Sequence, residues 1–259
     1  MDDQLLTDRA VLISGGTQGV GAGIARAALR EGATVVVTGR RPEPGRALVA
    51  ELRATGRITY VPADVGDVAS ARASVATAVD RMGRVDCLVN AAGLTSRGTL
   101  LDTTPELFDQ HVAVNLRGPF FLMQAVVADM LRRDSGGTIV NIISTSELGG
   151  QPYLAPYVAA KAGLAGLTRN AAHAHRFDRI RINGLDIGWT DTEGEDRTQR
   201  QFHGARDGWR EEAGKHLPMG RLSQVGEIAD FVVFLLSARS GVVTGSVIDW
   251  DQHVPGGRD

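Results

Sequence analysis

The sequence predicts an α/β fold, in which a doubly wound parallel β-sheet of the Rossmann type has helices on both faces. A single domain is expected over residues 1–259. Apolar runs rich in β-branched residues alternate with stretches of helical pattern along the whole chain. The runs are apolar on consecutive residues, which is typical of strands buried on both faces. Strands that alternate with helices form βαβ units with right-handed crossovers, and such units build a parallel sheet.

The strands are expected at Ala10–Ser14, Thr34–Thr38, Ile58–Val61, Val85–Asn90, Thr138–Ser144, Ile180–Leu185 and Gly245–Asp249. The helices are expected at Gly19–Arg30, Pro44–Ala54, Asp67–Met82, Pro105–Arg133, Pro156–His175 and Gln224–Leu236. Residues 188–216 form a long polar stretch, which we expect to be an irregular loop. Because long loops in compact domains are usually functional, we interpret this stretch as a substrate lid.

The composition is typical of a globular protein and excludes several function classes. Of the 259 residues, 43% are hydrophobic and 22% are charged, and the formal net charge is −2. This balance predicts no partner among nucleic acids or membrane surfaces. The single cysteine, Cys87, can form no internal disulfide, and no Cys/His cluster has the spacing of a metal site. The acidic start of the chain is not typical of a signal peptide, so a cytoplasmic protein is expected.

The first strand leads into a glycine-rich turn, Ser14-Gly15-Gly16-Thr17-Gln18-Gly19-Val20-Gly21, and a helix follows at once. The N–H groups of such a turn and the helix N-terminus attract the pyrophosphate of a dinucleotide. The glycine spacing is G-x-x-x-G-x-G and not the usual G-x-G-x-x-G. The alternative is that the glycines serve the tight turn alone. The candidate cofactor-binding residues here are Gly15, Thr17, Gln18, Gly19, Val20 and Gly21.

The end of the second strand indicates which dinucleotide binds. An NAD-binding fold normally places a carboxylate there, on the ribose 2′-hydroxyl. This chain instead has Arg40 and Arg41, whose charge and fork geometry suit a 2′-phosphate. The alternative is a solvated surface pair. NADP(H) is therefore favoured as the cofactor, and NAD(H) stays open.

Tyr157 and Lys161 are one helical turn apart, on a helix that begins near Pro156. A phenol titrates near pH 10 in water, and a fixed ammonium beside it favours the phenolate. Among the 28 basic residues of the chain, only Lys161 and Lys215 are lysines. The pair is therefore a candidate acid/base centre, in which Lys161 is expected to lower the pKa of Tyr157.

Two further groups are candidates for the same chemistry. Ser144 is expected at the carboxyl end of a central strand, where open α/β sheets bind ligands. Thr145 and Ser146 are alternative hydroxyls, and each of the three could instead make only a turn-capping bond. Pro119 lacks an N–H group, so the carbonyl of Asn115 loses its helical partner and could hold a water for proton relay. The alternative is a simple kink in the helix.

These segments, in this order, resemble the short-chain dehydrogenase/reductase family over the whole chain. Gly15, Gly19 and Gly21 match the family's cofactor turn, and Asp64, followed by Val65, matches its adenine-contacting acid. Asn90, Ala91 and Gly93 match its Asn-Asn-Ala-Gly motif. The resemblance implies that the catalytic tetrad is Asn115, Ser144, Tyr157 and Lys161. Ile187-Gly188 stands where the family has Pro-Gly, and Thr192 matches its nicotinamide-contacting threonine.

The resemblance implies an oxidoreductase that interconverts a carbonyl and a secondary alcohol, with Tyr157 as the acid/base. The polar lid favours a small sugar or polyol as the substrate, because a steroid or acyl chain would need an apolar lining. The alternatives are a carrier-bound 3-oxoacyl reductase and a non-catalytic dinucleotide sensor on the same fold. The resemblance also implies a homo-oligomer, either a tetramer or a dimer.

Overall fold

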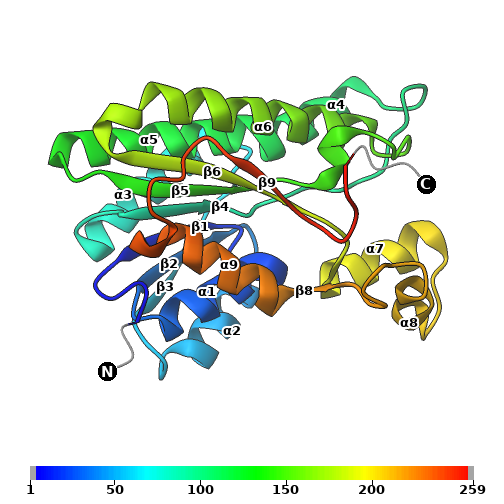
Figure 1. The fold of residues 1–259 in the computed structure, drawn as a ribbon, viewed down its shortest axis with the longest axis horizontal. Coiled ribbons are helices and arrows are strands. Elements are labelled where there is room, and N and C mark those ends of the chain that lie inside the picture. Colours follow the sequence, from blue (N-terminus) through cyan, green and yellow to red (C-terminus); the bar gives the residue numbers. More distant parts are fainter. Residues whose placement is uncertain (1–3, 256–259) are drawn as a thin grey trace.

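A parallel sheet lies between two layers of helices in the computed structural model, which describes residues 4–255 (Figure 1). Its strand order is β3-β2-β1-β4-β5-β6-β9, and every neighbouring pair is parallel. The strands are β1 (Ala10–Ser14), β2 (Thr34–Gly39), β3 (Ile58–Pro62), β4 (Cys87–Asn90), β5 (Gly137–Ile142), β6 (Ile180–Ile187) and β9 (Val247–Trp250). The predicted fold class is confirmed.

Helices α1, α2 and α9 pack on one face of the sheet, and α3, α5 and α6 pack on the other. Their bounds are α1 (Gly19–Arg30), α2 (Pro42–Leu52), α3 (Val68–Met82), α4 (Pro105–Val112), α5 (Gly118–Arg133), α6 (Ala155–Ala174) and α9 (Val225–Leu236). Short 3₁₀ turns lie at Thr145–Leu148, Arg176–Asp178 and Ala238–Ser240.

Along a central strand, successive side chains point to opposite faces of the sheet and are buried in two different hydrophobic cores. On β1, Val11 and Ile13 pack with α1 and α9, whereas Leu12 packs with α3 and α5. All three side chains are fully buried. This arrangement explains the consecutive apolar residues, because strands covered on both faces have no side exposed to water.

The helix expected at Pro105–Arg133 is broken in its middle. A π-helical turn, Ala113–Arg117, separates α4 from α5, and the N–H of Gly118 bonds the carbonyl of Ala113 five residues earlier. Pro119 follows within the first turn of α5. Because proline supplies no N–H, the hydrogen-bond pattern shifts here, and a π-turn absorbs the shift. The prediction of one continuous helix was wrong.

Residues 188–216 are not the irregular loop that was expected. They contain β7 (Thr190–Asp191), which pairs with β8 (Ser223–Gln224), and the helices α7 (Glu193–His203) and α8 (Trp209–Gly214). Thr192 caps α7 by accepting the N–H of Glu195, and acidic residues follow in its first turn. Local caps and charge pairs make this polar segment helical despite its lack of an apolar stripe. In Figure 1 both helices extend away from the end of the sheet.

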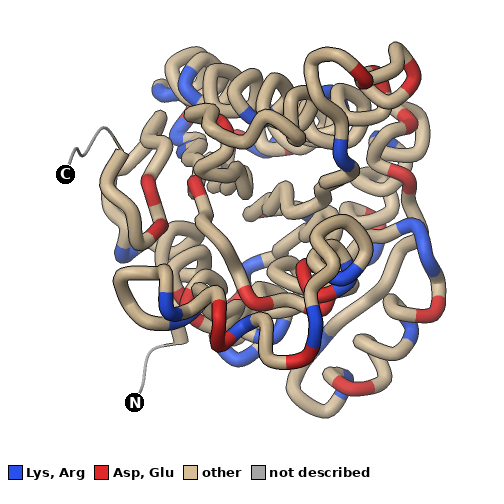
Figure 2. The backbone as a smooth tube through the Cα atoms, turned by 90° about the vertical axis from the view of Figure 1, so that its right-hand side faces the viewer, with Lys and Arg blue, Asp and Glu red and all other residues tan. Residues whose placement is uncertain are grey.

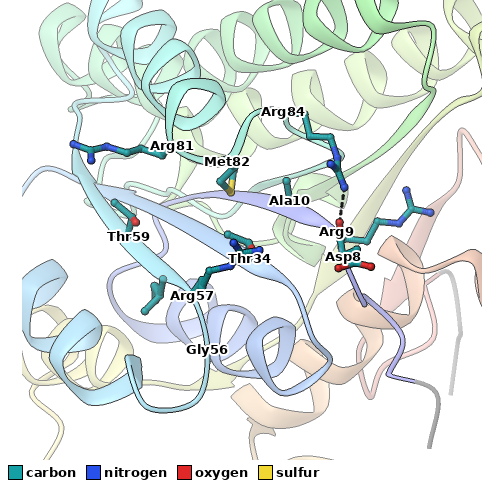
Figure 3. A pocket seen from close by; sticks show the side chains of 11 residues that line it. Asp8, Arg9, Ala10, Thr34, Gly56, Arg57, Thr59, Arg81, Met82 and Arg84 are labelled. Carbon is teal, nitrogen blue, oxygen red and sulfur yellow. Dashed lines mark hydrogen bonds between the residues drawn. The ribbon is translucent and has the colours of Figure 1, made fainter. Parts of the chain in front are cut away.

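A cavity of about 640 Å³ lies at the amino ends of β1, β2 and β3 (Figure 3). It is lined by exposed arginines, Arg9, Arg57, Arg81 and Arg84 among them. None of the predicted site residues lines it, and ligands of open α/β sheets bind at the carboxyl ends of the strands. The functional site therefore lies at the other edge of the sheet.

Basic and acidic residues are interspersed on the face that carries α7 and α8 (Figure 2). None of the helices between residues 4 and 255 is long and apolar enough to cross a membrane.

Candidate active site

A large cleft of about 940 Å³ opens at the carboxyl edge of the sheet, where the order of the strands reverses between β1 and β4. Most of the predicted site residues line it: Gly15, Thr17, Gln18, Gly19, Val20, Gly21, Arg40, Arg41, Val65, Ala91, Gly93, Tyr157, Lys161, Ile187 and Thr192. An adjoining pocket of about 530 Å³ shares Val20, Tyr157, Ile187 and Thr192 with it. Tyr157 therefore stands where the large cleft and the adjoining pocket meet.

The glycine turn has the shape of a phosphate cradle. Gly15 has φ +74°, and a Cβ atom added there would lie 2.5 Å from the Cα of Ala92. A Cβ on Gly21 would lie 2.2 Å from the carbonyl oxygen of Gly15. No side chain caps the N-terminus of α1, and its first turn has no acidic residue. These features fit a dinucleotide pyrophosphate, because backbone N–H groups and the helix dipole then face the ligand.

Arg40 and Arg41 lie at the end of β2 and are both exposed along the large cleft. Arg41 donates a hydrogen bond to the side-chain oxygen of Gln18, in the glycine turn. This bond fixes Arg41 beside the phosphate cradle. No carboxylate of β2 occupies this edge, because the strand ends in Thr38 and Gly39.

Three predicted cofactor residues do not line the large cleft. The carboxylate of Asp64 accepts the N–H of Gly66 at 2.9 Å and so shapes its own turn. The side chain of Asn90 is buried and donates to the Oδ1 of Asn141 at 2.8 Å. Gly188 lines the adjoining pocket. The Nδ2 of Asn90 therefore joins β4 to β5, whereas its Oδ1 has no partner within residues 4–255.

Asn115 is fully buried in the π-turn, and its side chain holds the loop that follows β4. Its Oδ1 accepts the N–H of Leu94 at 2.9 Å, and its Nδ2 lies 3.0 Å from the Leu94 carbonyl oxygen. The Nδ2 also lies 3.2 Å from the Nδ1 of His111. The side chain of Asn115 thus positions the wall of the site rather than pointing at a ligand.

His111 was not among the predicted site residues. It is fully buried one helical turn before Asn115, bonds Ser96 through its Nε2, and meets the Tyr157 ring edge-on at 6.2 Å between centroids. Burial lowers the pKa of His111, because desolvation disfavours the charged imidazolium, and the hydrogen bond to the Ser96 backbone opposes this shift. The sequence could have indicated this residue, because His111 stands four residues before Asn115 and so lies on the same face of a helix.

Ser144 lies two residues beyond the end of β5, so the prediction that it closes the strand was wrong. Its Oγ caps the following 3₁₀ turn by accepting the N–H of Ser146 at 3.3 Å, and lies 3.1 Å from the Ser146 Oγ. Ser144 lines the adjoining pocket together with Tyr157. The hydroxyl is therefore both a turn cap and a pocket group, and the cap holds it in place.

Lys161 lies one helical turn after Tyr157 on α6, and both side chains are buried. The Nζ of Lys161 donates to the carbonyl of Ile142 at 2.7 Å and lies 5.7 Å from the centroid of the Tyr157 ring. Burial lowers the pKa of Lys161 to about 8, against the opposing charge of Asp186.

Burial raises the pKa of Tyr157 to about 12, and the Ser144 hydroxyl opposes that rise. The expectation that Lys161 lowers the pKa of Tyr157 is not met here. Desolvation of the phenolate outweighs the charge of Arg97, because a buried phenol loses the water that would stabilise its charge, and the carboxylates of Asp186 and Glu195 add to the rise.

Asp186, at the end of β6, is a further group that the sequence interpretation missed. It is fully buried, and within residues 4–255 neither of its carboxylate oxygens has a hydrogen-bond partner of normal geometry. Burial raises its pKa to about 7, and the carboxylates of Glu147 and Asp249 add to the rise. The backbone N–H of Ser144 and the charge of Lys161 oppose it. The sequence could have indicated Asp186, because it is a carboxylate within an otherwise largely apolar strand.

The side of α7 that faces the adjoining pocket is polar. Glu195, Gln199 and His203 line the pocket beside Trp189. The Oε1 of Glu195 accepts both the Trp189 indole N–H and the Gln199 amide, each at 2.7 Å. Trp189 also stacks on Trp209, which is buried behind it. Within residues 4–255, no cluster of three or more His, Cys, Asp or Glu side chains could hold a metal ion.

Comparisons with known proteins place this geometry among oxidoreductases. Residues 15–253 match a family model described as enoyl-(acyl carrier protein) reductase. Oxidoreductase UcpA of Salmonella typhimurium is 34% identical over 254 residues, covering 96% of both chains. L-rhamnose 1-dehydrogenase (NAD(P)(+)) of Azotobacter vinelandii is 35% identical, covering 93% of this chain and 94% of its own. The crystal structure of levodione reductase has a TM-score of 0.89 at 32% identity, covering 95% of this chain and 97% of that one.

Proposed function

The chain belongs to the short-chain dehydrogenase/reductase family. We propose that it is an NADP(H)-preferring oxidoreductase that interconverts a carbonyl and a secondary alcohol. The observation that carries the proposal is the position of Tyr157, which lines both the large cleft and the adjoining pocket. A dinucleotide in the cleft and a substrate in the pocket would meet at its hydroxyl.

When bound, the dinucleotide supplies or accepts the hydride. Ser144 and Tyr157 hold the substrate oxygen, and Tyr157 gives that oxygen a proton in reduction and takes it back in oxidation. Lys161, fixed on the carbonyl of Ile142, places a positive charge beside the phenol and binds the nicotinamide ribose. Asn115 keeps the loop wall in position through Leu94, and its main-chain carbonyl would hold the relay water.

The NADP preference rests on Arg40 and Arg41 at the end of β2. Both line the cleft, and a 2′-phosphate there would meet two guanidinium groups and no carboxylate from the strand. Asp64 and Val65, Asn90 to Gly93, and residues 187–192 would complete the cofactor site on its adenine and nicotinamide sides. NAD(H) is the alternative cofactor.

A small polar molecule, such as a sugar or polyol, is the proposed substrate class, with residues 188–216 as its lid. The pocket side of the lid supports this, since Glu195, Gln199 and His203 offer hydrogen bonds there. One relative is named a rhamnose dehydrogenase. A carrier-bound 3-oxoacyl substrate is the second candidate, because the family model's description names an acyl carrier protein.

A homo-oligomer, tetramer or dimer, is part of the proposal. Phe108 on α4 is 44% exposed and Phe120 on α5 is 42% exposed, and a Cβ on Gly166 of α6 would meet open space. These helices could therefore pack closely against a second copy. Sedimentation at micromolar concentration should show a species larger than the monomer.

The proposed function is tested by NADPH oxidation on a panel of sugars, polyol-derived ketones, hydrophobic ketones and acyl thioesters, beside a fluorescence titration of the cofactor. We expect turnover, with kcat/KM for the polar compounds at least tenfold above that for the hydrophobic ones. Tight cofactor binding without turnover of any compound would indicate the sensor instead. Preference for hydrophobic ketones or thioesters would overturn the substrate class.

A further inference from the structure

Arg97 is a charged residue of the adjoining pocket for which the proposed reaction has no use. It lies in the loop after β4 and lines the pocket with Ser144 and Tyr157. Among residues 4–255, no other lysine or arginine lines this pocket. The charge of Arg97 also opposes the rise in the pKa of Tyr157, so the guanidinium acts on the reacting phenol from within range of a direct electrostatic effect.

The guanidinium of Arg97 is held rigidly. One Nη donates to the carbonyl of Thr95 at 2.7 Å, and the other lies 2.9 Å from the Nε2 of His203 on α7. The rings of Tyr153 and Phe202 lie 5.3 and 5.5 Å from it. Stacking on aromatic rings orients a guanidinium without neutralising its charge. Arg97 is therefore preorganised, which reduces the entropy lost when a ligand binds.

Within the part of the chain that the structure describes, the charge of Arg97 has no counter-ion. Within residues 4–255, Arg97 makes no ion pair with a carboxylate, and its buried Nε has no hydrogen-bond partner. Two arginines of the lid differ, since Arg200 and Arg210 both pair with Asp196. A guanidinium also carries more N–H donors than the two bonds to Thr95 and His203 use.

The acidic residues of the pocket are already engaged elsewhere. Glu195 accepts from Trp189 and Gln199, and the carboxylate of Asp251 faces His253 at 3.3 Å. A partly buried cation without a counter-ion is unfavourable, and a bound anion would remove that cost. The missing counter-ion would therefore come with the substrate.

We propose that Arg97 binds a carboxylate of the substrate, so that the enzyme acts on small oxo or hydroxy acids. This inference rests on the proposed function and narrows its polar substrate class. The carboxylate would contact the exposed edge of the Arg97 guanidinium, while Ser144 and Tyr157 hold the reacting oxygen. Other polar groups of the substrate would meet Glu195, Gln199 and His203.

The test compares each of a set of 2-, 3- and 4-oxo acids with its neutral primary amide, at saturating NADPH. We expect wild-type kcat/KM to favour the acid of the best pair by about tenfold to a hundredfold, the range of a charge-assisted hydrogen bond. Arg97→Gln should abolish that preference and change the amide less than about threefold. Arg97→Lys, which keeps the positive charge, should retain part of the preference for the acid.

Arg206→Gln is the matched control, because Arg206 is an exposed arginine of residues 188–216 that lines neither the adjoining pocket nor the large cleft. This variant should keep the acid preference. Equal losses for acid and amide in Arg97→Gln would show that Arg97 only clamps the lid, and would overturn the inference. A wild type that does not distinguish acids from amides would also overturn it.

Binding separates this inference from the proposed function. Trp189 lines the pocket, so tryptophan fluorescence can report the oxo acids whether or not they are reduced. Oxo-acid binding that Arg97→Gln weakens at least tenfold supports the carboxylate site even if no compound is turned over. Turnover of neutral ketones without any carboxylate binding sustains the oxidoreductase and rejects the site.

Discussion

The ammonium of Lys161 donates a hydrogen bond of 2.7 Å to the main-chain carbonyl of Ile142, the last residue of β5. The lysine is 3% exposed, so this bond ties helix α6 to the carboxyl end of the sheet inside the protein. It also fixes a positive charge 5.7 Å from the ring of Tyr157. The pair Tyr157–Lys161 is therefore positioned by both a helix and a strand.

Lys161→Arg should lower kcat by at least about a hundredfold, although the charge is kept. A planar guanidinium cannot replace a compact ammonium at a buried position without displacing its neighbours. Lys215→Arg is the matched control, because Lys215 is exposed and pairs with Glu212. Steady-state rates of the two variants provide the test. Near-normal activity of Lys161→Arg would show that this lysine does not set the charge beside Tyr157.

Asp186 predicts a pH-dependent stability. Its pKa in the folded protein is about 7, above the ordinary 3.8, so the folded state binds the proton more tightly than the unfolded state does. The stability that the protonated carboxyl confers is complete below about pH 4 and is lost as the pH rises through 7. The difference in Tm between Asp186→Asn and the wild type should therefore be larger at pH 8 than at pH 5, by about 2–4 °C in favour of the variant.

Thermal unfolding of the wild type and Asp186→Asn at pH 5 and pH 8 measures this effect. Asp80→Asn serves as the control, since Asp80 is exposed on α3 and is not among the charges that act on Asp186. The same Tm difference at both pH values would contradict the assignment of the titrating group.

Arg40→Ala should weaken NADP(H) binding about tenfold to a hundredfold and leave NAD(H) within about threefold. The difference arises because only NADP(H) carries the phosphate that a charge-assisted contact would lose. Titration of both cofactors measures the effect, with the exposed Arg53→Ala, which lies outside the cleft, as the control. Equal weakening of both cofactors would rule out the phosphate contact.

The fold was predictable because each strand of this sheet is apolar on consecutive residues. The first strand and the first helix were predicted at their observed bounds, Ala10–Ser14 and Gly19–Arg30. Strand ends were less predictable: the apolar run of β5 continues to Ile143, although the ladder stops at Ile142. Hydrophobicity reports burial, whereas a strand end depends on where the neighbouring strand stops pairing.

The polar lid was not predictable as helix, since α7 has no buried residue and its stability comes from capping and charge pairs. Arg97, His111 and Asp186 were missed for a related reason. Their importance lies in what surrounds them, and their partners are distant in the sequence or, for Asp186, missing within residues 4–255. The candidate tetrad residues came from the resemblance to the family, in which each has a fixed place relative to a strand or a helix.

The most direct test of the account is Tyr157→Phe, assayed on the best substrate of the carbonyl panel. The variant keeps the buried ring and removes the hydroxyl, so NADPH should bind within about threefold of the wild type. Turnover should fall by about 10²–10⁴, the usual contribution of general acid–base catalysis. NADPH binding and single-turnover rates measured side by side give the result. A Tyr157→Phe enzyme that reduces the carbonyl at nearly the wild-type rate would contradict the central claim.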